Sequence, residues 1–238
     1  MSQKYLGGFI TKSPVAPTSS AASGMWTLDQ AMQLKKQGLW PPTLPAIGSA
    51  FGGGYFAGQI STAGNGVADY NLVIGPVASA QSQLQWKTSG TTTVGTTSVI
   101  DGPTNSSNMN NASHPAAQFC EGLTIGGFSD WYMPAKNELE VCYYNLKPTT
   151  QSNNTSSGIN ANAVPARASN YTSGTPTQTS AADFITSTGA EAFAPNDFWT
   201  STEYSAPNAW KIDFFNGQQY YSGKTNSPRV RAIRRVAV

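Results

Sequence analysis

The stretch FWTSTEYSAPNAWKIDFFNGQQYYSGKTNSPRVRAIRRVAV, residues 198–238, decides the fold class. Apolar and polar residues alternate within AWKIDF, so Trp210, Ile212 and Phe214 would share one face of a strand and the polar residues between them the other. This pattern predicts a half-buried strand in an antiparallel sheet.

A β-hairpin and a final strand are predicted after this strand. Asn216 and Gly217 tolerate positive φ angles, which favours a two-residue type I′ turn, and QQYYSG would be the returning strand. RVRAIRRV interleaves β-branched residues with four arginines, as is typical of a last strand with one solvent-exposed face. We expect these arginines to form ion pairs or to be solvated at a sheet edge.

The composition predicts a folded chain with a polar but largely uncharged surface. Of the 238 residues, 11% are charged and 11% aromatic, and the net charge is +2. Disordered chains combine few aromatics with high net charge, so this chain should fold around a core of its own. The small positive charge predicts no nucleic-acid partner. With no run of about 20 apolar residues and no apolar signal core at the start, neither membrane insertion nor export by that route is expected.

The first 45 residues differ from the rest. Residues 1–24 are rich in Pro, Ser, Ala and Gly without periodicity, which predicts an extended arm. TLDQAMQLKKQG, residues 27–38, predicts a short helix with a capping-box start and a glycine stop. Its apolar stripe is small, so the helix must dock on the main domain, a sister chain or a different protein. We therefore expect an attachment or oligomerisation segment over 1–45 and a head domain over 46–238.

Strands are predicted at the start of the head domain. AFGGGYFAGQIS, DYNLVIGPV and QLQWKT each have strand length and turn formers at their ends, and tight β packing explains the glycines at 52–54. The Thr-rich segment that follows, residues 88–108, predicts a loop or an edge hairpin.

Two helices are predicted next. His114 and Pro115 open the first, which runs to about Leu123. GGFSDWYMP should then deliver Trp131 and its neighbours to the core, and AKNELEVCYYNLK forms the second helix, with Pro134 in its first turn. The apolar face of this helix comprises Leu139, Cys142, Tyr143 and Leu146.

Cys120 and Cys142 lie on these two predicted helices, so a disulfide and a pair of buried thiols both remain open. Residues 149–197 are mostly uncharged, turn-prone and aperiodic, apart from one helical turn predicted at 181–185. An irregular excursion of this length inside a compact domain is typical of functional surface.

Few residues suit a metal or catalytic site. The single histidine, His114, precedes a proline at a helix start and is expected to be a capping or surface residue. Glu138 and Glu140 are two apart on a helix and would point in different directions. Glu203 and Asp213 either face one another across the sheet or form ion pairs with nearby lysines and arginines. We expect no enzymatic activity, no cofactor and no metal.

The segments GFSDWYMPAKNELE, FWTSTEYS, AWKIDFFNGQQYYSGK and RVRAIRR together resemble the DUF1566 (Lcl-type) domain over about residues 47–238. This resemblance implies the C-type-lectin-like fold, an α+β fold of antiparallel sheets with two helices and a long irregular excursion, here preceded by an extended N-terminal arm. The motifs with which calcium-dependent lectins bind sugar are missing, as are the late cysteines of the enzyme branch. The resemblance therefore implies neither a calcium site nor thiol- or copper-dependent oxidation.

The stretch GGFITKSPVAPTSSAASGMWTLDQAMQLKKQGLWP is similar to the opening of bacteriophage tail-fibre or tail-tip proteins. This resemblance implies a phage virion protein, held to other tail proteins through residues 1–45 and binding a host-surface glycan or protein through its head. Several copies, in a trimer, would raise a weak affinity by avidity. The alternatives are a structural decoration or bracing protein of tail or capsid and a glycan-active enzyme.

The candidate binding surface is formed by the closing hairpin and the long excursion. Tyrosines bring large, rigid contact area and Ser, Asn and Gly adaptable hydrogen bonds, as in paratopes and sugar-binding surfaces. The same side chains would also suit an inert hairpin or a subunit contact. The candidate ligand-binding residues are Tyr204, Asn208, Lys211, Phe215, Asn216, Gln218, Tyr220, Ser222, Lys224 and Asn226.

Overall fold

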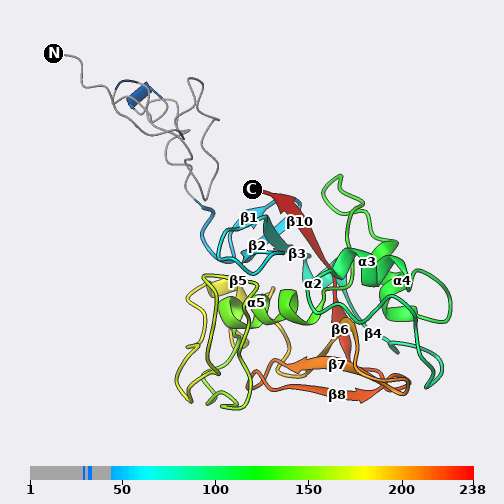
Figure 1. Cartoon of the computed structure of the whole chain (residues 1–238). Coiled ribbons are helices and arrows are strands. Elements are labelled where there is room, and N and C mark those ends of the chain that lie inside the picture. The colour runs from blue at the N-terminus through cyan, green and yellow to red at the C-terminus, as the bar shows by residue number, and fades with distance from the viewer. Residues whose placement is uncertain (1–28, 30–31, 34–43) are drawn as a thin grey trace, which may run out of the picture. The chain divides into compact units, whose positions relative to one another are not determined.

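The computed structural model describes Asp29, Met32, Gln33 and residues 44–238. The three isolated residues are helical, and the remainder of the predicted arm and short helix lies outside the described residues. The chain divides into two units, Met1–Pro45 together with Val238, and Ala46–Ala237. Figure 1 shows the second unit with its helices and strands labelled.

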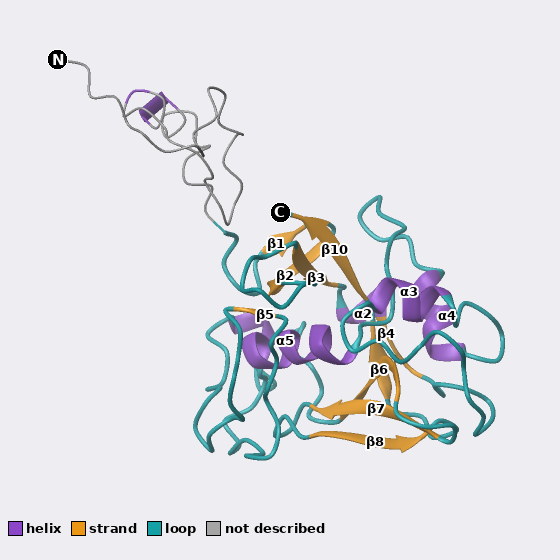
Figure 2. Cartoon of the chain, in the orientation of Figure 1, coloured by secondary structure: helices purple, strands orange, loops and turns teal. Residues whose placement is uncertain are grey.

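Two five-stranded sheets and a few short helices build this unit, which is therefore of the α+β class (Figure 2). The first sheet has the order β1 (Ala50–Phe51), β2 (Gly54–Ile60), β3 (Tyr70–Ile74), β10 (Ile233–Ala237), with β5 (Ala163–Val164) paired to β2. The second sheet has the order β4 (Gln81–Gln83), β9 (Arg229–Arg231), β6 (Asp197–Glu203), β7 (Asn208–Asp213), β8 (Gln219–Gly223). The helices are α2 (Val77–Ala80), α3 (Gly102–Ser107), α4 (Pro115–Glu121), α5 (Lys136–Leu146) and a 3₁₀ turn η1 (Ala182–Phe184).

Helix α5 lies between the two sheets and forms the main core with them (Figure 1). It contacts β2 and β5 of the first sheet and β6 and β7 of the second. The predicted helix and its apolar face are confirmed, since all four residues of that face are fully buried. The carboxylates of Glu138 and Glu140 are buried as well. Glu138 is bonded by Tyr132 and by Arg235 of β10, and Glu140 by Arg167 and Tyr171 of the excursion.

A second core cluster is built around three tryptophans, Trp86, Trp131 and Trp199. Each indole nitrogen donates to a backbone carbonyl, on Thr200, Phe128 and Leu84 respectively, at 2.8–3.1 Å. A buried indole N–H needs such a partner, so these bonds allow large side chains to fill the interior. The prediction that the segment before α5 delivers its aromatic residues to the core is confirmed.

RVRAIRRV forms two strands in different sheets, and the prediction of a single last strand with one exposed face is wrong. β9 ends at Arg231 and β10 begins at Ile233, with Ala232 at the crossing. The backbone of Ala232 bonds to Ala80 and Gly75, which lie between β3 and β4 where the chain also passes from one sheet to the other. The apolar–polar alternation breaks at the crossing, where Ala232 and Ile233 are adjacent apolar residues. Such a break is also what a β-bulge within one strand produces, so it does not by itself indicate a change of sheet.

The closing hairpin is confirmed as β7 and β8, but its turn is longer than the predicted two-residue type I′ turn. Residues 214–218 connect the strands, Gly217 alone has a positive φ, of 77°, and Asn216 does not. The reason is tertiary: Phe214 leaves the ladder to enter the core, and its N–H donates to the carbonyl of Asn196.

Other predictions need smaller corrections. Only Gln81–Gln83 is a strand in the region of QLQWKT, because Trp86 turns into the core. The Thr-rich segment contains helix α3 and, among the described residues, no hairpin. Pro134 precedes the N-cap residue of α5 and so lies just outside its first turn. The helical turn predicted in the excursion is confirmed as η1.

The two cysteines and the glycine run at 52–54 can be compared with their predictions. Cys120 and Cys142 are buried free thiols, so the disulfide alternative is not realised. Burial raises the pKa of both thiols, which keeps them protonated and unreactive. A Cβ at Gly54 would lie 2.3 Å from the carbonyl oxygen of Ile74, which confirms tight β packing at the glycine run.

Candidate functional site

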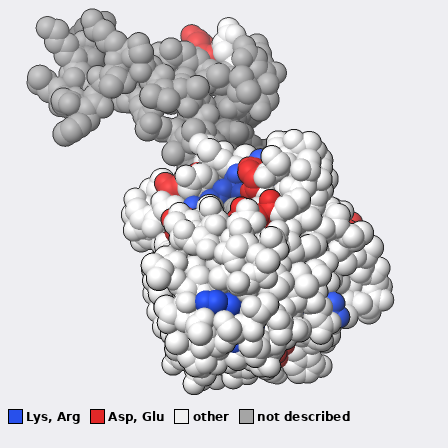
Figure 3. Space-filling model, turned by 90° about the vertical axis from the view of Figure 1, so that its right-hand side faces the viewer, with Lys and Arg blue, Asp and Glu red and all other residues white. Residues whose placement is uncertain are grey.

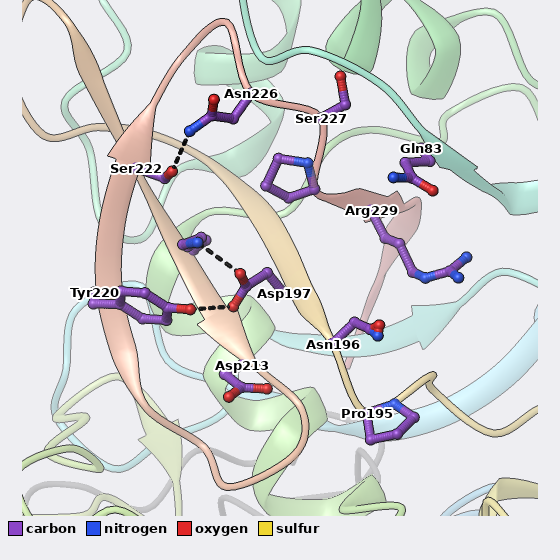
Figure 4. A pocket seen from close by; sticks show the side chains of 12 residues that line it. Gln83, Pro195, Asn196, Asp197, Asp213, Tyr220, Ser222, Asn226, Ser227 and Arg229 are labelled. Carbon is purple, nitrogen blue, oxygen red and sulfur yellow. Dashed lines mark hydrogen bonds and ion pairs between the residues drawn. The ribbon is translucent and has the colours of Figure 1, made fainter.

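A pocket of about 510 Å³ opens on the second sheet (Figure 4). Strands β4, β6, β7, β8 and β9 and the segments at 195–196 and 226–228 supply its walls. Most of the lining side chains are polar, and the volume falls within the range of small-ligand sites. The face of the molecule shown in Figure 3 is mostly uncharged, as the composition predicts.

One wall of the pocket is a hydrogen-bonded triad centred on Asp197. Lys211 donates from Nζ to Oδ2 at 2.6 Å, and the hydroxyl of Tyr220 donates to Oδ1. The Lys211 ammonium also lies 4.3 Å from the centre of the Tyr220 ring. Burial and the bond to Asp197 raise the pKa of Tyr220, so its phenol remains protonated. The triad holds the wall rigid and neutralises the charge of Asp197.

Asp213 lies beside this triad, directly opposite Asp197 in the β6–β7 register. Its Oδ1 accepts from the N–H of Phe215 at 2.8 Å, and it has no ion-pair partner among the described residues. Burial, reinforced by the charge of Asp197, raises the pKa of Asp213. The predicted ion pair is thus wrong for Asp213, whereas Glu203 does pair with Lys224 at 2.8 Å.

The opposite wall contains Arg229, the exception among the arginines of the last two strands. The predicted ion pairs are confirmed for the other three, each of which bonds a carboxylate at 2.7–2.8 Å. Arg229 has no ion pair and no side-chain hydrogen bond with other described residues, and it lines the pocket. The three formed pairs are Arg231–Glu191, Arg234–Asp130 and Arg235–Glu138.

The other face of the β7–β8 hairpin carries an aromatic cluster of Tyr204, Trp210 and Tyr221. The two tyrosine rings stack with centroids 4.0 Å apart and an interplanar angle of 6°, and they are 46% and 48% exposed. Trp210 meets Tyr204 edge-on at 5.0 Å, and the ammonium of Lys136 lies 5.0 Å from the Trp210 ring. Tyrosine and tryptophan are enriched at interfaces because they combine an apolar ring with a polar group, so this cluster is a candidate contact surface.

A buried charged network supports the loop at residues 91–93. Lys87 donates to the carbonyls of Thr91 and Thr92, and Lys224 donates to Thr91 and to Glu203. His114 lies in the same network, 5% exposed, with Nε2 2.8 Å from the hydroxyl of Thr93. Burial and the two lysines lower the pKa of His114 to about 4. The predicted capping position is confirmed, since His114 is the N-cap residue of α4, but the surface alternative is wrong, because the side chain is buried and makes no capping hydrogen bond.

The predicted binding residues separate into three groups. Lys211, Tyr220, Ser222 and Asn226 line the pocket, where Asn226 donates to Ser222 at 2.8 Å. Tyr204 belongs to the aromatic cluster. The remaining five stabilise or flank turns, or lie in the interior: Asn208, Phe215, Asn216, Gln218 and Lys224, the last of which is fully buried.

The predicted site residues did not include the wall of the pocket around Arg229, nor two of the three residues of the aromatic cluster, Trp210 and Tyr221. Gln83, Asn196 and Arg229 come from segments outside the hairpin, and Gln83 in particular is far from it in sequence. The hairpin pattern itself could have indicated Tyr221, since residues 220 and 221 must face opposite sides of a strand.

Two classes of site are absent from the part of the chain that the structure describes. Within residues 44–238, no group of three His, Cys, Asp or Glu side chains is placed to hold a metal ion. Likewise, none of the described helices has the length and apolarity needed to cross a membrane. Glu138 and Glu140 bond to different partners, Arg235 and Arg167, as their spacing predicts.

Comparison with known proteins agrees with the resemblance seen in the sequence. No curated protein matches the chain. The family model of the Lcl C-terminal domain matches residues 75–234, which is more than half of the chain and includes every strand of the second sheet. The chain therefore belongs to the family of Lcl C-terminal domains.

Proposed function

We propose that this protein is a non-enzymatic virion protein of a bacteriophage, a distal tail fibre or adhesin that binds a glycan or protein on the host surface. The observation that carries the proposal is the β7–β8 hairpin, which presents a polar pocket on one face and stacked, exposed tyrosines on the other. Hydroxyl, amide and carboxylate groups beside rigid aromatic rings are the chemistry with which proteins bind sugars and polar epitopes.

The proposed fold of the head is C-type-lectin-like. Antiparallel pairing throughout the first sheet, the two longer helices α4 and α5 and the irregular excursion at 149–197 support this assignment. In this proposal the second sheet is the platform that presents the hairpin, and the core around α5 holds that platform in place.

Residues 1–45 are proposed to attach the protein to other tail proteins, with several copies on each particle in a trimeric arrangement. A single pocket of this size on a sheet surface gives modest affinity. Several copies that engage one cell together would raise the overall affinity by two to four orders of magnitude, roughly 10²–10⁴-fold.

Glycan hydrolysis is a second candidate, favoured by one specific observation. Asp197 and Asp213 are direct cross-strand neighbours in the pocket, and the pKa of Asp213 is raised by burial. Two carboxyl groups with different proton affinities are what glycoside hydrolysis requires. Against this, both oxygens of Asp197 are already bonded, to Lys211 and Tyr220, which leaves this carboxylate poorly placed as nucleophile or base. Release of reducing ends from host polysaccharide, lost in Asp213→Asn, would establish the enzyme.

Binding of the purified full-length protein to cells within the host range tests the proposal. We expect saturable binding that Tyr220→Ala weakens about tenfold or more, because the change removes both a hot-spot aromatic ring and a member of the triad at Asp197. Val94→Ala, at a side chain 87% exposed and outside the pocket, should bind as the unchanged protein does. Absence of binding to every cell that the phage infects would instead favour a decoration or bracing protein of tail or capsid.

A further inference from the structure

Two opposite charges in the pocket have no ion-pair partner among the described residues. They are the carboxylate of Asp213 on β7 and the guanidinium of Arg229 on β9. Strand β6 lies between β7 and β9, with Asp213 opposite Asp197 and Arg229 opposite the next residue, Phe198. Neighbouring strands are spaced at about 4.8 Å, so the two backbones are roughly 10 Å apart.

Strand β6 separates these two charges and provides a counter-charge to neither of them. The charge of Asp197, on that strand, is balanced by its ion pair with Lys211, and Tyr220 donates a hydrogen bond to its other oxygen. Figure 4 shows Asn196 between Asp213 and Arg229 in this view. The pocket is therefore neutral as a whole, with a negative end and a positive end.

Each end also offers hydrogen-bonding groups that match its charge. Gln83 is the register partner of Arg229, and its side-chain amide, like that of Asn196, makes no hydrogen bond with other described residues. These two amides and the guanidinium supply donors for an anionic group. At the other end, one oxygen of Asp213 is held by the N–H of Phe215, and the second has no donor among the described residues.

We propose that the pocket binds a zwitterionic sugar unit, with its ammonium group at Asp213 and its carboxylate or phosphate at Arg229. This inference rests on the proposed glycan-binding function and specifies its ligand. A neutral sugar would leave both charges without a counter-charge. An anionic sugar would be attracted by Arg229 but repelled by Asp213, and a cationic sugar would be attracted by Asp213 but repelled by Arg229.

Four small sugars that share the glucose ring and differ in the charged groups attached to it test the proposal against the full-length protein. Glucosamine 6-phosphate carries both charges, glucose 6-phosphate and glucosamine carry one each, and glucose carries none. Calorimetric titration near pH 6, where the amine is protonated, should show glucosamine 6-phosphate binding at least about tenfold more tightly than either singly charged sugar. Muramic acid, an amino sugar with a carboxylate, then distinguishes a carboxylate ligand from a phosphate ligand.

Two conservative variants assign the ends of the pocket. In Asp213→Asn, glucosamine 6-phosphate should no longer bind more tightly than glucose 6-phosphate. In Arg229→Gln, it should no longer bind more tightly than glucosamine. Val94→Ala serves as the control that changes neither ratio. Equal or tighter binding of glucose 6-phosphate to the unchanged protein would overturn the proposal, as would binding of none of the four sugars. Host-cell binding that depends on Tyr220 would survive either result, so failure of this inference can be told apart from failure of the proposed function.

Discussion

Replacing Arg231 with alanine is expected to lower the free energy of unfolding by about 3–5 kcal/mol. Arg231 is fully buried and donates to the carbonyls of Gly75 and Glu191 and to the Glu191 carboxylate, each at 2.8 Å. Its guanidinium also lies 4.7 Å from the centre of the Phe193 ring. Removing it leaves the Glu191 carboxylate without its counter-charge and a buried carbonyl without a donor. Urea unfolding followed by tryptophan fluorescence measures the loss.

Arg229→Ala is the matched control, since it removes the same side chain from the same strand. Arg229 has no ion pair with other described residues, so its loss should change the free energy of unfolding by no more than about 0.5 kcal/mol. Similar losses in both variants would contradict the assignment of Arg231 to the interior and Arg229 to the pocket.

Phe214→Ala is expected to cost a comparable amount, about 3–5 kcal/mol, because it opens a cavity in the main core. The Phe214 ring is fully buried, stacked on Phe193 at 3.9 Å and edge-on to Phe198 and Tyr143 at 4.9 Å and 5.4 Å. Alanine forfeits these contacts where α5, β6 and the excursion meet. The midpoint of urea unfolding should fall with an unchanged denaturant slope.

The adjacent phenylalanine provides the comparison. Phe215 is 43% exposed on the hairpin loop, so Phe215→Ala should lower stability by less than about 1 kcal/mol. If Phe215→Ala lowered the free energy of unfolding as much as Phe214→Ala, burial of Phe214 in the core would not explain the effect of its replacement. Because both changes remove the same atoms one residue apart, the comparison isolates the effect of burial.

The local sequence pattern was sufficient to predict the elements whose buried face follows directly from the helix or strand period. The period of α5 predicts its four core residues because a helix between two sheets must present apolar side chains at that spacing. The β7–β8 hairpin follows from alternation in the same way. The burial of the His114 side chain was not predicted, because its neighbours are Thr93, 21 residues upstream, and two buried lysines, which no local pattern reveals.

By itself, the sequence determined the α+β class, the helices α4 and α5, the closing hairpin and the family, since each depends on periodicity or on motifs within short segments. Only the tertiary structure decided where RVRAIRRV divides between two sheets and which of its arginines is left without a partner. It alone brought Arg229 and Asp213 to opposite sides of β6. The physical reason is that burial and charge pairing depend on neighbours from distant parts of the chain, whereas strand and helix periods depend on the backbone alone.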